Sequence, residues 1–370
     1  MNSDHPDPPI PQPPADSDSN SAPRQIPPAQ VILIGQPQTG ERQSAGPQRR
    51  ARGPRTRLAL MLFLFTCLST FLTGFVGEAV IPRVFEVDLR ARKKMFTIEF
   101  SGRVFNGLIY SGCVMAILTA HELGHYLQAR RYRVPASLPY FIPFPVSPFG
   151  TMGAVIVQQS GVADRKSMFD IAITGPLAGL VIALPVAYVG ILNSRVAAIG
   201  GAVPVYGNPL LLKWMYQALH GPIPVGSSIQ LNPILFAGWV GIFITALNLV
   251  PIGQLDGGHI LYCLIGRKAH YVARALFVFA ASVVVVNVFF LDNQAYIAWW
   301  LMLFLIWIFD TRHPPTANDR VPLGRVRVAL GWLALMFVFI GFTPTPIYIN
   351  ESVPKPRPAI RRSPGQEIRI

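Results

Sequence analysis

Charged side chains are scarce in this chain of 370 residues, where Asp, Glu, Lys and Arg together make up 14% of the sequence. A soluble globular protein carries about 25%. Hydrophobic residues reach 51%, and the mean hydropathy is +0.39. The few charges cluster in short segments, and the apolar runs between them have about the 20 residues that are needed to cross hydrocarbon. The composition therefore excludes an ordinary soluble enzyme and indicates a multi-span membrane protein.

Cysteine is also rare, and acidic residues are fewer than basic ones. The three cysteines lie in or beside apolar segments without a CxxC spacing, which favours small core residues over a disulfide framework or a thiolate metal site. The chain has 32 Lys and Arg against 18 Asp and Glu, a net charge of +14. Much of this basic charge flanks apolar runs, as expected for residues that orient spans and meet anionic lipid headgroups. Since none of the known nucleic-acid-binding modules is present, we expect the lipid bilayer and no nucleic acid as a partner.

The chain divides into three regions by composition. Residues 1–57 hold 12 of the 35 prolines and little that could form a core, which predicts a disordered, Pro-rich cytoplasmic tail. Residues 58–343 form the predicted transmembrane domain, and 344–370 a C-terminal tail. The tail at the N-terminus does not read as a secretory signal, and its early aspartates fit poorly with an organellar transit peptide.

Seven apolar segments predict an all-α polytopic membrane protein with about seven transmembrane helices. They are 58–77, 104–129, 171–194, 235–253, 275–291, 294–309 and 328–342. Two connections have a different character. Residues 140–161 are rich in proline and carry the β-branched content of a strand from Gly153 to Gln159, which predicts a small re-entrant β-type loop. Residues 195–234 contain NPLLLKWMYQALHG, a predicted short helix on the membrane surface.

The distribution of basic residues predicts the orientation of the chain. With the N-terminus inside and seven alternating spans, the inside segments hold 19 Lys and Arg and the outside segments 13. This bias follows the positive-inside rule, although RARKK at 90–94 lies outside. On this topology, the ends of the second and fourth spans both face the cytoplasm.

The second span ends in the stretch HELGH, which fits the pattern H-E-x-x-H. His121 and His125 are four residues apart, so on a helix they lie within about 40° of each other and can bind one cation. Imidazole nitrogens suit Zn²⁺ at about 2.0–2.1 Å. Glu122 can reach a zinc-bound water as a general base without being a ligand. The alternative is a helix end that reaches water and binds nothing, but ionisable groups in an otherwise uncharged span usually mark function.

A catalytic zinc site takes a third protein ligand, and the segment ALNLVPIGQLDGGHI (246–260) offers two candidates. Pro251 should end the fourth helix, which leaves Asp256 on a turn at membrane depth, and this residue is the favoured ligand. His259 is its rival three residues later. We expect Asn248 either to hold two helices together by a hydrogen bond between them or to polarise a substrate carbonyl group.

HELGH together with N-LVP-IGQ-LDGG resembles the site-2 protease family of intramembrane zinc metalloproteases, over about residues 105–265. The later RHPPT (312–316) is similar to the cyanobacterial and chloroplast-type branch. The resemblance implies a three-helix catalytic core with one zinc ion per chain, bound by His121, His125 and Asp256. It also implies Glu122 as the catalytic base and Asn248 as an auxiliary group. Membrane-anchored regulatory proteins are the substrates that the family suggests, and a bacterial plasma membrane is the expected location.

Within this frame, residues 140–161 can add a strand to an unwound substrate helix or can be a re-entrant packing loop. The sequence GPLAG (175–179) is expected to pack the third span tightly against the zinc helices.

Two other functions fit the composition. One is a transporter in which the His, Glu and Asp cluster serves as a metal or proton relay, against which stands the absence of repeated broken helices. The other is an inactive scaffold, against which stands the complete motif set.

Overall fold

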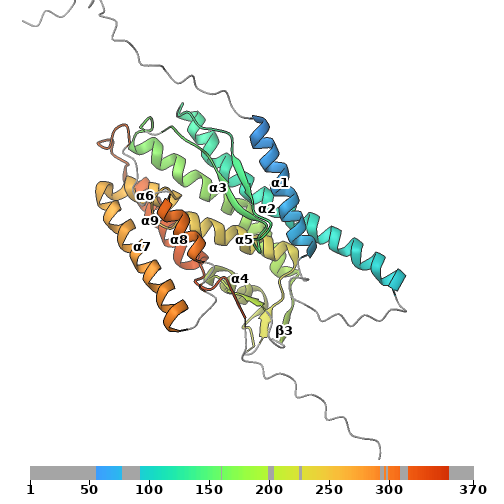
Figure 1. The fold of residues 1–370 in the computed structure, drawn as a ribbon. Helices are drawn as coiled ribbons and strands as arrows, with labels where there is room; N and C mark the ends of the chain where they lie inside the picture. The colour runs from blue at the N-terminus through green and yellow to red at the C-terminus, as the bar shows by residue number, and fades with distance from the viewer. Residues whose placement is uncertain are drawn as a thin grey trace, which may run out of the picture. The chain divides into compact units, whose positions relative to one another are not determined.

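The computed structural model describes residues 56–76, 92–159, 161–198, 204–224, 227–291, 296, 299–308 and 316–349 (Figure 1). Almost all of the predicted N-terminal tail and the end of the predicted C-terminal tail lie outside these residues. The helices are α1 (Thr56–Val76), α2 (Arg92–Arg131), α3 (Arg165–Leu192), α4 (Leu210–His220), α5 (Pro233–Asn248), α6 (Asp256–Ile265), the 3-10 turn η1 (Gly266–Lys268), α7 (Ala269–Val285), the π turn η2 (Val286–Phe290), α8 (Trp299–Ile308) and α9 (Arg325–Gly341). The strands are β1 (Tyr140–Pro143), β2 (Thr151–Val155), β3 (Val196–Ala198), β4 (Pro204–Tyr206), β5 (Ser227–Ile229) and β6 (Ile347–Ile349).

The described chain is mostly helical and belongs to a membrane protein, as its composition predicts. Four helical stretches are long and apolar enough to cross a bilayer: Thr56–Val76, Ser101–Arg131, Arg165–Leu192 and Asp256–Phe290. The helices α5 and α8, which correspond to two further predicted spans, are shorter apolar helices of 16 and 10 described residues. Helix α9, in the seventh predicted span, has 17 residues. The described helices therefore do not confirm seven full-length spans.

The difference is clearest at the fourth predicted span, 235–253. Its helix α5 ends at Asn248, three residues before Pro251, whose ring is incompatible with a helix interior. The chain turns and becomes helical again at Asp256. The prediction that Asp256 lies on the turn is therefore wrong, because this residue is the first of α6. Helix α6 ends at Ile265, and its C-cap Gly266 has a φ of +63° that suits glycine. The helical stretch Asp256–Phe290 is therefore interrupted at Gly266, between α6 and α7.

Helix α3 is the element that joins the others. It packs against α2, α5 and α6, and it also contacts α4 and α9 (Figure 1). Its first three turns are almost wholly buried, and it contains Pro176 and Pro185. Small residues allow its closest approach to α5, since a β-carbon on Gly238 would lie 2.6 Å from the Cα of Ala187. Helix α1 packs on the other side of α2.

The predicted re-entrant β-type loop is a two-stranded antiparallel hairpin. Strand β1 pairs with β2, from Tyr140 opposite Val155 to Pro143 opposite Thr151. The hairpin packs on α1, where the rings of Phe141 and Phe63 meet edge to face at 5.2 Å between centroids. Its turn is attached to α1 by a hydrogen bond of 2.6 Å from the Ser69 hydroxyl to the carbonyl oxygen of Gly150. The hairpin is therefore fixed on α1, and its strand β2 also contacts α2, the helix that contains HELGH.

Two more two-stranded antiparallel sheets were not predicted. Strand β3 pairs with β5, and β4 pairs with β6, which belongs to the predicted C-terminal tail. Each strand has three residues, too few for the alternation of hydrophobic and polar side chains that reveals a strand in a sequence. The short helix predicted in NPLLLKWMYQALHG is present as α4, with Leu212 and Tyr216 buried.

Candidate metal centre

Helix α2 carries the HELGH motif in its buried part. His121, Glu122 and His125 expose 3%, 4% and 7% of their surface, values that are rare for ionisable residues unless they are paired or bind a metal. The two imidazole rings lie on one face of the helix with their centroids 5.0 Å apart. The helical spacing of the motif therefore has the predicted effect.

Asp256 brings the third ligand from a distant part of the chain. Its Oδ2 lies 3.2 Å from Nε2 of His121, and its Oδ1 lies 3.3 Å from Nε2 of His125. Among the described residues, these three are the group of His, Cys, Asp or Glu side chains whose ligand atoms come close enough to hold a metal, all within 4.8 Å of one another. His259 is not part of this group.

The turn before α6 places Asp256 at this point. Residues 249–255 connect α5 to α6 by short backbone hydrogen bonds, such as the one of 2.8 Å from the amide of Ile252 to the carbonyl of Val250. A β-carbon on Gly257 would collide with the carbonyl of Leu249, and one on Gly258 would collide with that of Gly253. The two glycines of LDGG thus let α6 begin directly against the turn.

Helix α3 provides the surface behind the two histidines. Gly175 faces His125 and Gly179 faces His121, and a β-carbon on Gly175 would overlap the His125 ring. A glycine of α2 also allows the close approach of the two helices, because a β-carbon on Gly124 would lie 2.6 Å from the carbonyl oxygen of Thr174 in α3. The prediction that GPLAG packs α3 tightly against the zinc helix is confirmed by these contacts.

A backbone carbonyl of α3 orients His125. Nδ1 of His125 lies 2.8 Å from the carbonyl oxygen of Ile171, and since a carbonyl can only accept, Nδ1 carries the proton. In the neutral ring, Nε2 then presents its lone pair towards Oδ1 of Asp256. Nothing in the sequence indicates this contact, because any residue at position 171 supplies the same carbonyl group.

Asn248, the last residue of α5, lies at the same centre. Its Nδ2 is 3.3 Å from Nε2 of His121, so the amide can donate to that nitrogen. This contact, from the end of α5 to the HELGH motif of α2, places Asn248 beside the group of three rather than among lipid-facing side chains. Both uses that the sequence left open, helix contact and substrate contact, are compatible with this position.

The donor set fits a zinc ion. An imidazole nitrogen that lies 3.2–3.3 Å from a carboxylate oxygen either donates a proton to that oxygen or shares a cation with it. Two ligands that each lie about 2.1 Å from a tetrahedral zinc are about 3.4 Å apart, close to both separations. Two imidazoles and one carboxylate are also a ligand set of catalytic zinc, which keeps a fourth position open.

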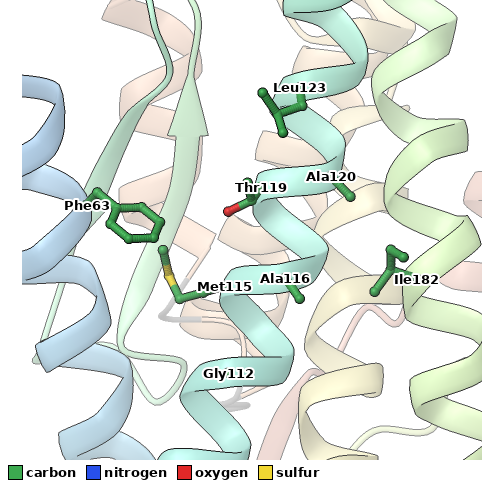
Figure 2. A pocket seen from close by; sticks show the side chains of 8 residues that line it. All are labelled: Phe63, Gly112, Met115, Ala116, Thr119, Ala120, Leu123 and Ile182. Atoms are coloured by element: carbon green, nitrogen blue, oxygen red, sulfur yellow. The ribbon is translucent and has the colours of Figure 1, made fainter. Parts of the chain in front are cut away.

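An apolar groove runs along α2. It has a volume of about 480 Å³. Figure 2 shows its lining side chains, which come from α1, α2 and α3, with a strand of the hairpin between α1 and α2. The lining residues are Phe63, Gly112, Met115, Ala116, Thr119, Ala120, Leu123 and Ile182. The groove extends along α2 to the level of the HELGH motif, at Ala120 and Leu123. At about 100° per residue, its lining residues of α2 lie on a different face of the helix from His121 and His125.

Comparison with known proteins agrees with this geometry. Residues 109–291 match peptidase family M50. The chain is 33% identical over 260 residues to the probable zinc metalloprotease EGY1, chloroplastic, of Oryza sativa subsp. japonica, which covers 63% of this chain and 43% of that protein. It is 32% identical to EGY1 of Arabidopsis thaliana (62% and 42% covered) and 30% identical to EGY2 of the same plant (62% and 40% covered).

The chain spans less than half the length of each of these relatives. The matched segment contains both motifs and every residue of the metal centre described above. Through this segment, the chain is similar to peptidase family M50 and to the zinc metalloproteases named above.

Proposed function

We propose that this chain is an intramembrane zinc metalloendopeptidase that cleaves transmembrane segments of membrane-anchored regulatory proteins. The observation that carries the proposal is the convergence of His121 and His125 from α2 with Asp256 from α6 at one buried point. These three side chains would hold the metal. When bound, zinc polarises the scissile carbonyl group and acidifies the attacking water.

Glu122 is the proposed general base. It lies next to His121 on α2 and is 4% exposed, so it acts in a site from which bulk water is largely excluded. It is not one of the three residues whose ligand atoms converge, which leaves its carboxylate to accept the proton of water and to pass it to the leaving amine.

Asn248 is the proposed auxiliary group. Its amide lies 3.3 Å from Nε2 of His121, the atom that would bind the metal. One lone pair cannot serve both the amide and a cation, so metal binding frees the amide protons of Asn248. They can then donate to the carbonyl oxygen of the substrate as negative charge develops on it.

The apolar side chains along α2 and the hairpin beside this helix support an apolar, extended substrate. The groove along α2 has apolar side chains apart from Thr119, as a transmembrane segment requires. The β1–β2 hairpin beside it can add a strand to an unwound segment, because a peptide bond inside a helix is protected by its own hydrogen bonds.

We further propose the topology that the sequence predicts, with seven crossings and the centre towards the cytoplasmic side of a bacterial plasma membrane. The fourth crossing would be the broken pair α5 and α6, since irregular backbone at membrane depth is tolerated where it is buried in protein. The excess of basic residues in the inside segments supports this orientation.

The first test is the zinc content of the detergent-purified chain, in wild type, Asp256→Ala and His259→Ala. It requires no knowledge of the substrate. We expect about one zinc per chain in the wild type, loss of zinc in Asp256→Ala, and retention in His259→Ala. A wild type that holds no metal after reconstitution with zinc would overturn the proposal, and loss in His259→Ala alone would overturn the ligand set.

A further inference from the structure

A second polar cluster lies just beyond the metal centre and includes a residue outside the segment 109–291 that matches the family. Arg327 of α9 binds the carboxylate of Asp170 of α3 with two hydrogen bonds, Nε to Oδ1 at 2.7 Å and Nη2 to Oδ2 at 2.9 Å. Tyr132, which follows the last residue of α2, donates its hydroxyl to Oδ2. Three helices therefore meet at one carboxylate.

This carboxylate is partly buried near the start of an apolar helix. The side chain of Asp170 is 12% exposed and that of Arg327 is 32% exposed. A charge in such a place is costly unless it is paired, and a planar guanidinium that binds both oxygens fixes the geometry of the pair. The ion pair thus sets the position of the second turn of α3 relative to α9.

Asp170 directly precedes the residue that orients a metal ligand. The carbonyl oxygen of Ile171 accepts the hydrogen bond from Nδ1 of His125. One turn further, the hydroxyl of Thr174 lies 2.9 Å from the carbonyl oxygen of Asp170 and 3.2 Å from that of Gly124. Helix α2 and the residue that follows it are therefore joined to α3 at three successive levels, and the outermost, Tyr132 to Asp170, shares its carboxylate with Arg327.

We propose that Arg327 and Asp170 are positioning residues for the metal centre. By fixing the start of α3, the ion pair holds the Ile171 carbonyl where it orients His125, so that Nε2 points to Asp256. This inference rests on the proposed function, because it requires a metal ion held by the group of three. It assigns to α9, outside the family match, a role in the geometry of the site.

The test compares variants of the full chain in detergent. Arg327→Gln removes the positive charge. Arg327→Lys keeps the charge but lacks the planar guanidinium that binds both carboxylate oxygens. The double variant Asp170→Asn/Arg327→Gln removes both charges. Arg325→Gln is the matched control, since Arg325 is an exposed arginine of the same helix, two residues away. Each variant is measured for zinc affinity by chelator competition, for the visible spectrum after loading with Co²⁺, and for thermal unfolding without metal.

We expect Arg327→Gln to weaken zinc binding by about tenfold, the lower end of the effect of removing groups that orient metal ligands. Its Co²⁺ spectrum should change because the coordination of His125 changes. Arg327→Lys should fall between Arg327→Gln and wild type, and the double variant should lose no more affinity than Arg327→Gln, because it leaves no unpaired carboxylate. Arg325→Gln should match the wild type in every measurement.

Each outcome decides the question. If Arg327→Gln lowers only thermal stability and keeps the zinc affinity and Co²⁺ spectrum of the control, the ion pair merely anchors α9 and the inference is wrong. If Arg327→Gln does not fold, Arg327→Lys decides in the same way. If the wild type itself binds neither Zn²⁺ nor Co²⁺, the proposed function fails together with the inference, and this result is distinct from a loss in the variants alone.

Discussion

Gly175 of α3 lies against the imidazole of His125 so closely that a β-carbon at position 175 would overlap the ring. One turn away, a β-carbon at Gly179 would lie 3.1 Å from Nδ1 of His121. The two glycines and the two histidines share a spacing of four residues, so α2 and α3 match turn by turn. The positions of the histidines therefore depend on the absence of side chains on α3 as well as on their own spacing on α2.

Replacing Gly175 with alanine should remove zinc from the protein. The added methyl group has to displace the His125 ring, because the backbone of α3 is packed against α2 and cannot retreat. We expect at least a tenfold loss of zinc affinity in Gly175→Ala, measured by chelator competition on the purified chain. The matched control is Gly102→Ala on α2, where an added β-carbon has no neighbour within 4 Å. Equal zinc affinities in the two variants would contradict the prediction.

Replacing Glu122 with glutamine should separate chemistry from metal binding. Glutamine has the same shape but cannot accept the proton of water, and residue 122 is not in the group of converging ligands. Cleavage of a co-reconstituted model membrane protein with one transmembrane helix should fall by about 10²–10⁴-fold. The zinc content, measured on the same sample, should stay that of the wild type. Loss of zinc would make Glu122 a ligand, and unchanged cleavage would exclude it as the base.

An element of this fold could be predicted from the sequence where its cause is local, and could not where it depends on contacts between distant residues. The long apolar runs predicted α1, α2 and α3, because hydrophobicity and helical length are local properties. The break after Asn248 followed from Pro251, which acts on its own backbone. The pairing of β4 with β6 joins segments about 140 residues apart and has no local signal, so it was missed.

The metal centre shows the same division. His121, Glu122 and His125 could be found because one helix brings them together at a fixed spacing. Asp256 was favoured over His259 by the motif around it, and the structure brings Asp256, not His259, into the group of converging ligand atoms. The carbonyl of Ile171 and the ion pair of Asp170 with Arg327 were missed, because one is a backbone group and the other joins residues 157 positions apart.

Packing of α3 on α5 can be tested without reference to function. Gly238 lies against Ala187, where a β-carbon would be 2.7 Å from the backbone nitrogen. Gly238→Ala should therefore lower the free energy of unfolding by about 1–3 kcal/mol, the usual effect of overpacking a close contact. Thermal unfolding in detergent measures the change. The control Gly112→Ala, which meets nothing within 4 Å, should be as stable as the wild type or more so.

The start of α3 provides a prediction about pH. Asp164 is the N-cap of this helix, and its carboxylate accepts hydrogen bonds from the amide of Ser167 at 2.7 Å and from the Ser167 hydroxyl at 2.6 Å. Burial raises the pKa of Asp164, but these hydrogen bonds, with one from the amide of Lys166, outweigh it and hold the pKa below its ordinary value. Asp164→Ala should cost about 1 kcal/mol of stability at neutral pH, as the loss of a cap does.

The sign of the pH dependence follows from the direction of this shift. A carboxyl group with a lowered pKa in the folded state stabilises the protein fully above its unfolded pKa, about 3.9, and loses that contribution as the pH falls through the folded value. The difference in melting temperature between wild type and Asp164→Ala should therefore be constant from pH 7 to about pH 5 and shrink in more acidic buffer. Asp164→Asn keeps a capping oxygen without a titratable proton, so it should lie close to the wild type at neutral pH and gain relative to it in acid. A difference between wild type and Asp164→Ala that stays constant in acid would mean that the cap does not depend on the charged form of Asp164, and one that grows would mean that folding raises the pKa of Asp164 instead of lowering it.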